Sequence, residues 1–241
     1  MQLKMADNNK EFVPAHEVQA IADRIIKQYK EYKDMNSSER LIVGIAGRPG
    51  SGKTNLANMI ADVISNRTNN DIHVIVMPMD GYHLYRSELS QLPNSEYAFS
   101  RRGAHWTFNP AKLYRDLKRI ASGDEIRVPS FDHSLKDPKE DDIVIPADAK
   151  VILVEGNYLL YTDDASWKKV SEMFQLKIFL ECDPTECTER LTRRHMNSLE
   201  ISREEAMLRA KGSDSKNGDL IDTTKGNADL VCHSNVVLNV V

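Results

Sequence analysis

The chain has 241 residues, a length that suits one large α/β domain or two small ones. Its hydrophobic content of 41% supports a core, and its net charge of −4 lacks the basic excess typical of nucleic-acid binders. No apolar run is long enough for a transmembrane helix, and the charged N-terminus does not read as a signal peptide. The cysteines fit neither a metal nor a disulfide pattern, which favours reduced thiols in a cytoplasmic protein. They are Cys182, Cys187 and Cys232.

The predicted elements alternate between helix and strand along the chain. They begin with an amphipathic helix over 15–33, where apolar residues recur at helical spacing, followed by a loop through Asn36, Ser37 and Ser38. The others are, in chain order, a strand at 41–46, a helix at 55–64, a strand at 72–77, a helix from Pro110 with Asn109 as its N-cap, strands at 151–154 and 176–180, a helix from Asp183, and a last strand at 236–241.

Strands that alternate with helices predict a mostly parallel sheet covered by helices on both faces. The segments 81–108 and 123–148 look less regular, so we expect them to form a substrate-facing surface or a lid rather than part of the sheet. We divide the chain into an N-terminal helical extension, 1–39, and a single domain, 40–241.

Residues 47–54 fit the phosphate-binding loop pattern G-x-x-x-x-G-K-[ST], and they lie between a predicted strand and a predicted helix, as that motif requires. Glycines let the backbone approach a phosphate closely, and successive N–H groups at the helix start hold the anion. Lys53 is expected to reach the β- and γ-phosphates of a nucleotide, and the Thr54 hydroxyl to ligate Mg²⁺. The loop consists of Gly47, Arg48, Pro49, Gly50, Ser51, Gly52, Lys53 and Thr54.

Two acidic residues follow predicted strands: Asp80 lies shortly after the strand at 72–77, and Glu155 comes directly after the strand at 151–154. Ligands of a parallel sheet bind outside the carboxyl ends of its strands, so both carboxylates are expected near the phosphates. Asp80 can accept or orient the proton of an attacking hydroxyl, and Glu155 can hold Mg²⁺ directly or through water. The simpler alternatives are a turn-capping aspartate and a surface glutamate before a glycine turn.

Arg193 and Arg194 lie three and four residues after Arg190 on the helix predicted from Asp183, where the arginines can point together at a phosphate. Neighbouring helical positions differ by about 100°, so Arg194 should share a face with Arg190 while Arg193 lies to one side. A solvated basic surface is the alternative interpretation.

Two clusters of polar and aromatic residues suit a small-molecule pocket. The first is the run Arg101-Arg102-Gly103-Ala104-His105-Trp106, and the second is Phe131-Asp132-His133. Trp106 on its own is also compatible with a place in the core.

The order of these motifs resembles the phosphoribulokinase/uridine kinase superfamily of P-loop kinases. The step from Asp80 to His83 looks closer to the pantothenate kinase-like branch. The runs Arg101–Ala104 and Val154–Leu160 are most similar to the "putative fructose transport system kinase" group and its fungal relatives, many of them labelled uridine kinase-like. The motifs that carry the resemblance are Gly47–Thr54, Asp80-Gly81-Tyr82-His83, Phe131-Asp132-His133, Glu155-Gly156-Asn157-Tyr158 and Arg193-Arg194-His195.

The resemblance implies an α/β P-loop fold of three layers, with a lid segment, and ATP and Mg²⁺ as cofactors. It makes Asp80 the catalytic base, places Glu155 at the magnesium and assigns Arg193, with Arg194, to the lid over ATP. Asn217 would lie near the adenine, although Ser213 replaces the asparagine that begins the corresponding family pattern. The expected substrate-binding residues are Tyr82, His83, Arg101, Arg102, His105, Trp106, Asp132, His133 and Asn157.

We therefore predict an ATP-dependent kinase that phosphorylates a hydroxyl of a small metabolite: a nucleoside, a sugar, a sugar acid or a pantothenate-like molecule. Uridine kinases usually carry Asp-Ser-Phe-Tyr where this chain has Asp80-Gly81-Tyr82-His83, which disfavours uridine itself. The alternatives are a nucleotide-controlled regulatory ATPase or switch, and a binding module without turnover. The chain lacks the guanine and switch motifs of GTPases, and it keeps Lys53, Thr54 and both acids. We expect a monomer or homodimer without nucleic-acid or membrane partners.

Overall fold

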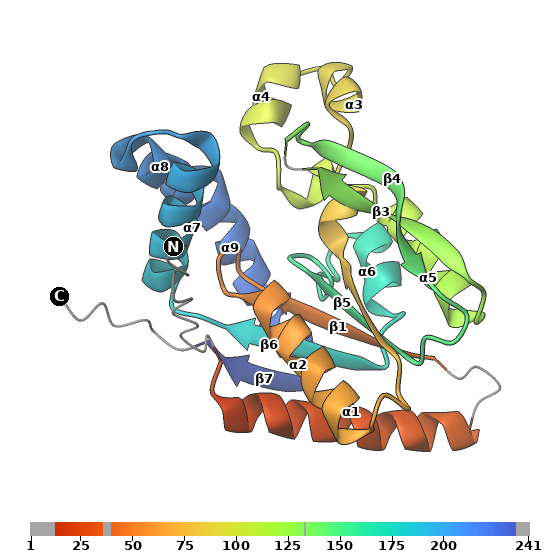
Figure 1. Cartoon of the computed structure of the whole chain (residues 1–241). Helices are drawn as coiled ribbons and strands as arrows, with labels where there is room; N and C mark the ends of the chain where they lie inside the picture. Colours follow the sequence, from red (N-terminus) through yellow and green to blue (C-terminus); the bar gives the residue numbers. More distant parts are fainter. Residues whose placement is uncertain (1–12, 36–39, 133, 235–241) are drawn as a thin grey trace, which may run out of the picture.

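The computed structural model describes residues 13–35, 40–132 and 134–234. Its centre is a five-stranded sheet in the order β2-β5-β1-β6-β7, and every pairing in it is parallel, which confirms the predicted sheet type (Figure 1). In that order the strands are Val74–Pro78, Val151–Gly156, Leu41–Gly47, Leu176–Glu181 and Leu230–His233.

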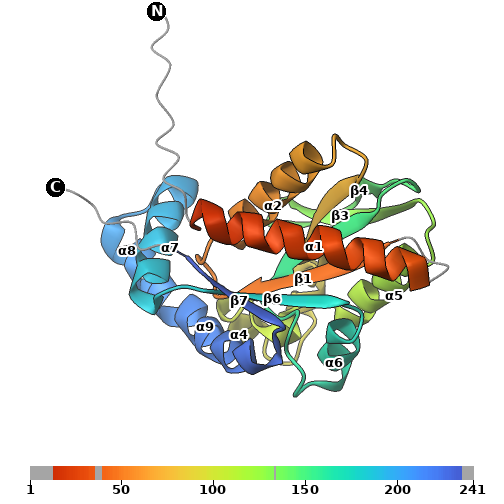
Figure 2. The same cartoon turned by 90° about the horizontal axis from the view of Figure 1, so that it is seen from below.

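Helices cover both faces of this sheet, as expected for strands whose neighbouring residues point to opposite sides. In β1, Leu41 and Val43 pack with α1 (Ala15–Met35) and α2 (Lys53–Arg67), whereas Ile42 faces the other core. That second core contains residues of α5 (Pro110–Ala121) and α6 (Ala165–Ser171). Figure 2 shows α1 running across the underside of the sheet beside α2.

The amphipathic helix predicted near the N-terminus is present as α1. Its apolar stripe includes Val18, Ile21, Ile25 and Tyr29, all buried in the same core as β1 and α2. The division of the chain at residue 40 remains a prediction, and α1 contributes to the core of the domain that follows it.

The segment 123–148, predicted to be irregular, instead forms an antiparallel hairpin of β3 (Ile126–Asp132) and β4 (Asp137–Ile145), apart from the central sheet. Its place outside the central sheet agrees with the prediction. Its regular structure was not predicted, because β4 is mostly exposed and densely charged and so has no alternating apolar pattern. A register shift between Val128 and Ser130 further breaks the period.

Short elements flank the carboxyl ends of the strands. On one side lie η1 (Met79–Tyr82), α3 (Arg86–Ser90), α4 (Ser95–Ser100) and η2 (His105–Thr107). On the other side lie α7 (Pro184–Leu199), α8 (Arg203–Arg209), η3 (Ala210–Asp214), α9 (Ser215–Asp222) and η4 (Thr223–Asn227). Figure 1 shows these two groups standing apart above the sheet.

The predicted loop at Asn36–Ser38 and the predicted strand at 236–241 lie outside the described residues. The last described strand is β7, which the sequence analysis did not predict.

Arg40, a buried residue just before β1, links segments that are distant in sequence. Its guanidinium donates hydrogen bonds of 2.7 to 3.2 Å to four backbone carbonyls, and the residue is 2% exposed. The acceptors are the carbonyls of Ala149, Ile120, Asp124 and Pro146.

Replacing Arg40 with methionine should lower the free energy of unfolding by about 3 kcal/mol, because buried carbonyls lose a charged donor. Urea unfolding measures the change. Arg24→Met, at an exposed position on α1, is the matched control and should stay within about 0.5 kcal/mol of the unmodified protein. A change that small in Arg40→Met would contradict the assigned role.

Candidate active site

The phosphate loop joins β1 to α2 at the carboxyl edge of the sheet. Gly50 and Gly52 have φ angles of +83° and +99°, a left-handed region that glycine adopts without strain. The Lys53 ammonium donates hydrogen bonds of 3.0 Å to the carbonyls of Gly47 and Arg48, so it folds back over the loop. Burial lowers the pKa of Lys53, an effect opposed by the nearby Glu155 and Asp80 carboxylates.

The Thr54 hydroxyl donates a hydrogen bond of 3.0 Å to Glu155 Oε1, which links the start of α2 to the end of β5. Glu155 is 8% exposed, so it is not a surface residue before a turn. Burial raises the pKa of its carboxyl group, while Lys53 opposes the rise.

The oxygen donors at Thr54 and Glu155 fit Mg²⁺, which takes few protein ligands at nucleotide sites and keeps several waters. Among the described residues, no cluster of three or more His, Cys, Asp and Glu side chains has metal-binding geometry. Any metal here would therefore rely on phosphate and water oxygens for the rest of its coordination.

Asp80 reaches the same edge from β2, through η1. Strand β2 pairs with β5 so that Pro78 lies opposite Glu155, which brings the two acids close. Electrostatic coupling of Asp80 with both Lys53 and Glu155 accompanies this arrangement. The topology thus gathers a lysine, a threonine and two carboxylates from three strand ends.

Gly81, directly after Asp80, is where η1 contacts the hairpin. A Cβ at this position would lie 2.2 Å from the carbonyl oxygen of Pro129 in β3. Only glycine allows this contact, which fixes the backbone next to Asp80.

The three arginines of α7 differ in their surroundings. The Arg190 side chain is 8% exposed, pairs with Glu186 at 2.8 Å and donates to the Ser51 carbonyl at 3.1 Å, so it stabilises the phosphate loop. Arg193 lies 3.8 Å from Glu186. Arg194 is exposed, and its charge lowers the pKa values of Lys53 and Glu155, which places it toward the catalytic edge.

Arg48 and Asn217 link the phosphate-loop side of the site to neighbouring elements through side-chain contacts. The Arg48 side chain is 5% exposed and pairs with Asp222 and Asp219 of α9, the latter at 3.0 Å. Asn217 is buried, and its side-chain carbonyl accepts a hydrogen bond of 3.1 Å from Arg101. These contacts tie α9 to the phosphate loop and to the segment after α4.

Tyr82 and His83, which follow Asp80 in the chain, have different surroundings. The buried Tyr82 hydroxyl donates a hydrogen bond of 3.0 Å to Asp116 of α5. His83 Nδ1 lies 2.8 Å from the Asp80 carbonyl, and its ring packs against Phe108 and Phe131.

The predicted polar cluster 101–106 does not converge on one point. Arg102 donates to the Leu84 carbonyl and to Asp137, 2.9 and 3.0 Å away. The His105 ring lies against Tyr158 and Tyr161, and burial lowers its pKa. Trp106 is 38% exposed and stacks on Tyr97, so it is not a core residue.

The remaining predicted substrate-binding residues have different settings. Asp132 shapes the hairpin turn by accepting hydrogen bonds from the Ser134 hydroxyl and from the backbone of Leu135 and Ser134, and these bonds lower the pKa of its carboxyl group. Asn157 is half-buried directly after β5. His133 lies outside the described residues.

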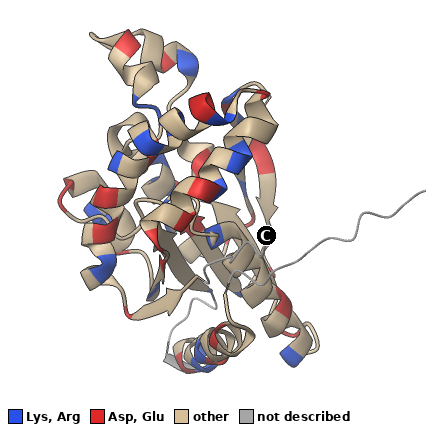
Figure 3. Ribbon diagram, turned by 90° about the vertical axis from the view of Figure 1, so that its left-hand side faces the viewer, with Lys and Arg blue, Asp and Glu red and all other residues tan. Residues whose placement is uncertain are grey.

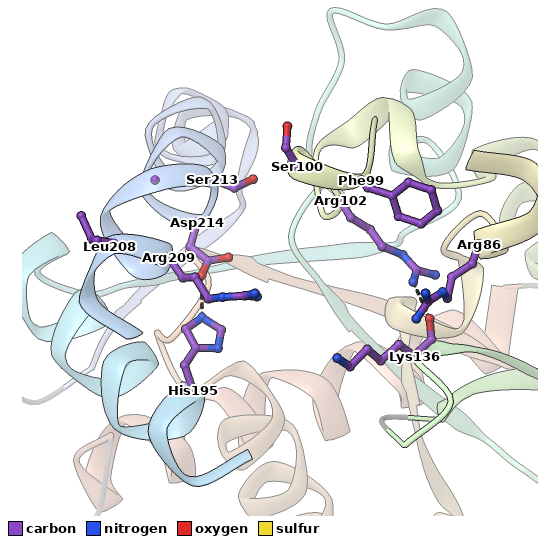
Figure 4. Close-up of a pocket in the computed structure, with 11 residues that line it drawn as sticks. Arg86, Phe99, Ser100, Arg102, Lys136, His195, Leu208, Arg209, Ser213 and Asp214 are labelled. Atoms are coloured by element: carbon purple, nitrogen blue, oxygen red, sulfur yellow. Dashed lines mark hydrogen bonds and ion pairs between the residues drawn. The ribbon is translucent and has the colours of Figure 1, made fainter. Parts of the chain in front are cut away.

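A cleft of about 680 Å³ separates the two groups of elements above the sheet (Figure 4). Among its lining residues, Arg102, His195 and the Ser213–Asp214 step belong to motifs recognised in the sequence, and the others do not. Figure 3 shows acidic and basic positions interspersed along the helices on one side of the molecule. Its lining residues are Arg86, Phe99, Ser100, Arg102, Lys136, His195, Leu208, Arg209, Gly212, Ser213 and Asp214.

A parallel sheet with a phosphate loop after β1, acids at the ends of β2 and β5, and an arginine-bearing helical segment beside them defines a P-loop kinase. The Phosphoribulokinase / Uridine kinase family model matches residues 42–238, and the chain belongs to that family.

Similar proteins agree with this assignment. "Putative uridine kinase C227.14" of Schizosaccharomyces pombe is 33% identical over 201 residues, which cover 82% of this chain and 84% of that protein. The crystal structure of a "putative fructose transport system kinase" from Silicibacter sp. TM1040 has a TM-score of 0.79 and 26% identity, covering 89% of this chain and 98% of that one. YFH7 from Saccharomyces cerevisiae, a "putative P-loop containing kinase", has a TM-score of 0.75 at 20% identity, covering 92% and 98%, which supports the fold alone.

The family and the fold class predicted from sequence are thus confirmed, and the chain is a P-loop kinase, a family that uses ATP. No helix within the described ranges is both long and apolar enough to span a membrane.

Proposed function

We propose that this kinase transfers the γ-phosphoryl group of ATP, with Mg²⁺, to a hydroxyl of a small metabolite. The observation that carries the proposal is the meeting of Lys53, Thr54, Glu155 and Asp80 at one edge of the sheet. A loop that binds phosphate does not by itself need Asp80, whereas transfer to a hydroxyl needs a carboxylate placed beside the phosphates.

Each group has a role in this proposal. The loop N–H groups and the Lys53 ammonium hold the phosphates, and Lys53 turns from the Gly47 and Arg48 carbonyls toward them. Thr54 and Glu155 would hold Mg²⁺, which neutralises charge on the phosphate oxygens when bound. Asp80 accepts or orients the proton of the acceptor hydroxyl. The proposed setting is a cytoplasmic monomer or homodimer.

The acceptor is chosen from nucleosides, sugars, sugar acids and pantothenate-like molecules. The names of two similar proteins, uridine kinase and fructose transport system kinase, support testing nucleosides and sugars first. A metabolite library assayed for ATP consumption, with mass detection of products, tests the proposal. ATP use that depends on an acceptor supports it. Acceptor-independent hydrolysis would instead indicate a regulatory ATPase, and no turnover would indicate a binding module.

The arginines of α7 give a separate test. Arg194→Ala should lower kcat more than it raises the KM for ATP, because a lid arginine acts mainly on charge in the transition state. Arg193→Ala should have a smaller effect, because this side chain is close to Glu186. Steady-state kinetics at saturating acceptor measure both. Unchanged kcat in both variants would indicate that these arginines form a solvated basic surface of α7 with no role in catalysis.

A further inference from the structure

The cleft above the sheet has two walls that come from different parts of the chain. One wall carries Arg86 and Arg102, from the segment after Asp80, together with Lys136 of the hairpin turn. The opposite wall carries His195 of α7 and Arg209 of α8. In Figure 4, Lys136 and Arg209 extend from opposite walls toward the space between them.

The charge in this cleft is mostly unneutralised. Arg86, Lys136 and Arg209 have no ion-pair partner within the described parts of the chain, and all three are exposed. Arg102 pairs with Asp137, which is not a lining residue. Asp214 is the one carboxylate among the lining residues. Its Oδ2 lies 2.9 Å from His195 Nε2, within hydrogen-bond distance. The free positive charges favour an anionic occupant.

Two buried polar atoms in the same cleft also lack partners. Arg102 Nε and the Ser213 hydroxyl are buried and make no hydrogen bond with the rest of the described protein. Buried donors are normally satisfied by protein, water or ligand. The oxygens of a phosphate or a carboxylate could accept hydrogen bonds from both sides of the cleft.

The position of the cleft favours the acceptor over the nucleotide. None of its lining residues belongs to the phosphate loop, which supplies its own lysine and N–H groups to ATP. Asp214 also lines a smaller pocket next to Arg48 and Pro49, so the cleft adjoins the loop. The wall that carries Arg86 and Arg102 follows Asp80, the expected base, in the chain.

We propose that the metabolite phosphorylated by this kinase carries a second, anionic group, a phosphate or a carboxylate, which binds between Arg86, Lys136 and Arg209. This inference rests on the proposed function and narrows it. Phosphorylated sugars and sugar acids become the preferred acceptors, and neutral nucleosides and neutral sugars are disfavoured.

The protein is first saturated with Mg²⁺ and a non-hydrolysable ATP analogue. Inorganic phosphate and, in a parallel experiment, malonate are then titrated into it, and calorimetry measures their binding. The analogue fills the phosphate loop, so a further anion must bind elsewhere. The variant combines Arg86→Gln with Lys136→Gln, and Lys169→Gln, exposed on α6, is the control. We expect at least about tenfold weaker anion binding in the double variant and no change in the control.

Tighter binding of phosphate than of malonate would identify a phosphorylated acceptor. Tighter binding of malonate than of phosphate would identify a carboxylated acceptor. Absence of binding for both anions, or equal binding by the double variant and the unmodified protein, would overturn the inference. A preceding titration of the protein with the ATP analogue and Mg²⁺ records whether the analogue binds at all. Failure of the analogue to bind would overturn the proposed function itself, and it is visible before any anion is added.

Discussion

Replacing Lys53 with methionine should lower turnover by roughly 10²–10³-fold while leaving the chain folded. The Lys53 ammonium is the charged group of the phosphate loop that we expect to contact the phosphates, and methionine keeps most of the aliphatic stem without the charge. The residue is 8% exposed, so methionine is a gentler substitution than alanine. The kcat and the midpoint of thermal unfolding are measured together.

Lys169→Met, which removes a lysine from an exposed position on α6, provides the matched control and should keep full turnover. Near-normal turnover in Lys53→Met would be incompatible with a nucleotide site at this loop. A collapse of the thermal midpoint together with activity would show a structural role, and Lys53→Arg would then separate charge from packing.

Asp80→Asn should reduce kcat by about 10²–10⁴-fold with little change in ATP affinity. Asparagine keeps the size and hydrogen bonding of aspartate but cannot accept the proton. The turnover number and the dissociation constant of Mg·ATP are both measured, because the two roles open to Asp80 affect them differently.

An equal loss of ATP binding and turnover would mark Asp80 as a ligand of the metal rather than the base. Asp163→Asn, an exposed aspartate after β5, serves as the control and should change neither quantity. Full activity in Asp80→Asn would indicate that Asp80 only caps a turn and takes no part in catalysis.

The parts of the fold that sequence predicts best are those buried on both faces. Strands β1 and β5 are fully buried, so they read as continuous apolar runs and were predicted within a few residues. Strand β4 is exposed and charged, and β7 has only four residues, so neither carries a pattern that distinguishes it from loop.

The candidate site divides in a similar way. The positions of Asp80 and Glu155 follow from a local rule, that ligands lie beyond the carboxyl ends of parallel strands. The ion pairs of Arg48 with Asp219 and Asp222 join residues more than 170 positions apart, and no local pattern reveals them. The cationic cleft likewise depends on tertiary contacts, because Arg86, Lys136 and Arg209 belong to no common motif.

The fate of the γ-phosphoryl group tests the central claim most directly. The protein is incubated with γ-labelled ATP, Mg²⁺ and a library of hydroxylated metabolites, and the products are separated by mass spectrometry. We expect the label in one metabolite, bound as a phosphate ester, and its loss in Asp80→Asn. Label found solely in inorganic phosphate, at a rate that no metabolite changes, would contradict the assignment as a small-molecule kinase.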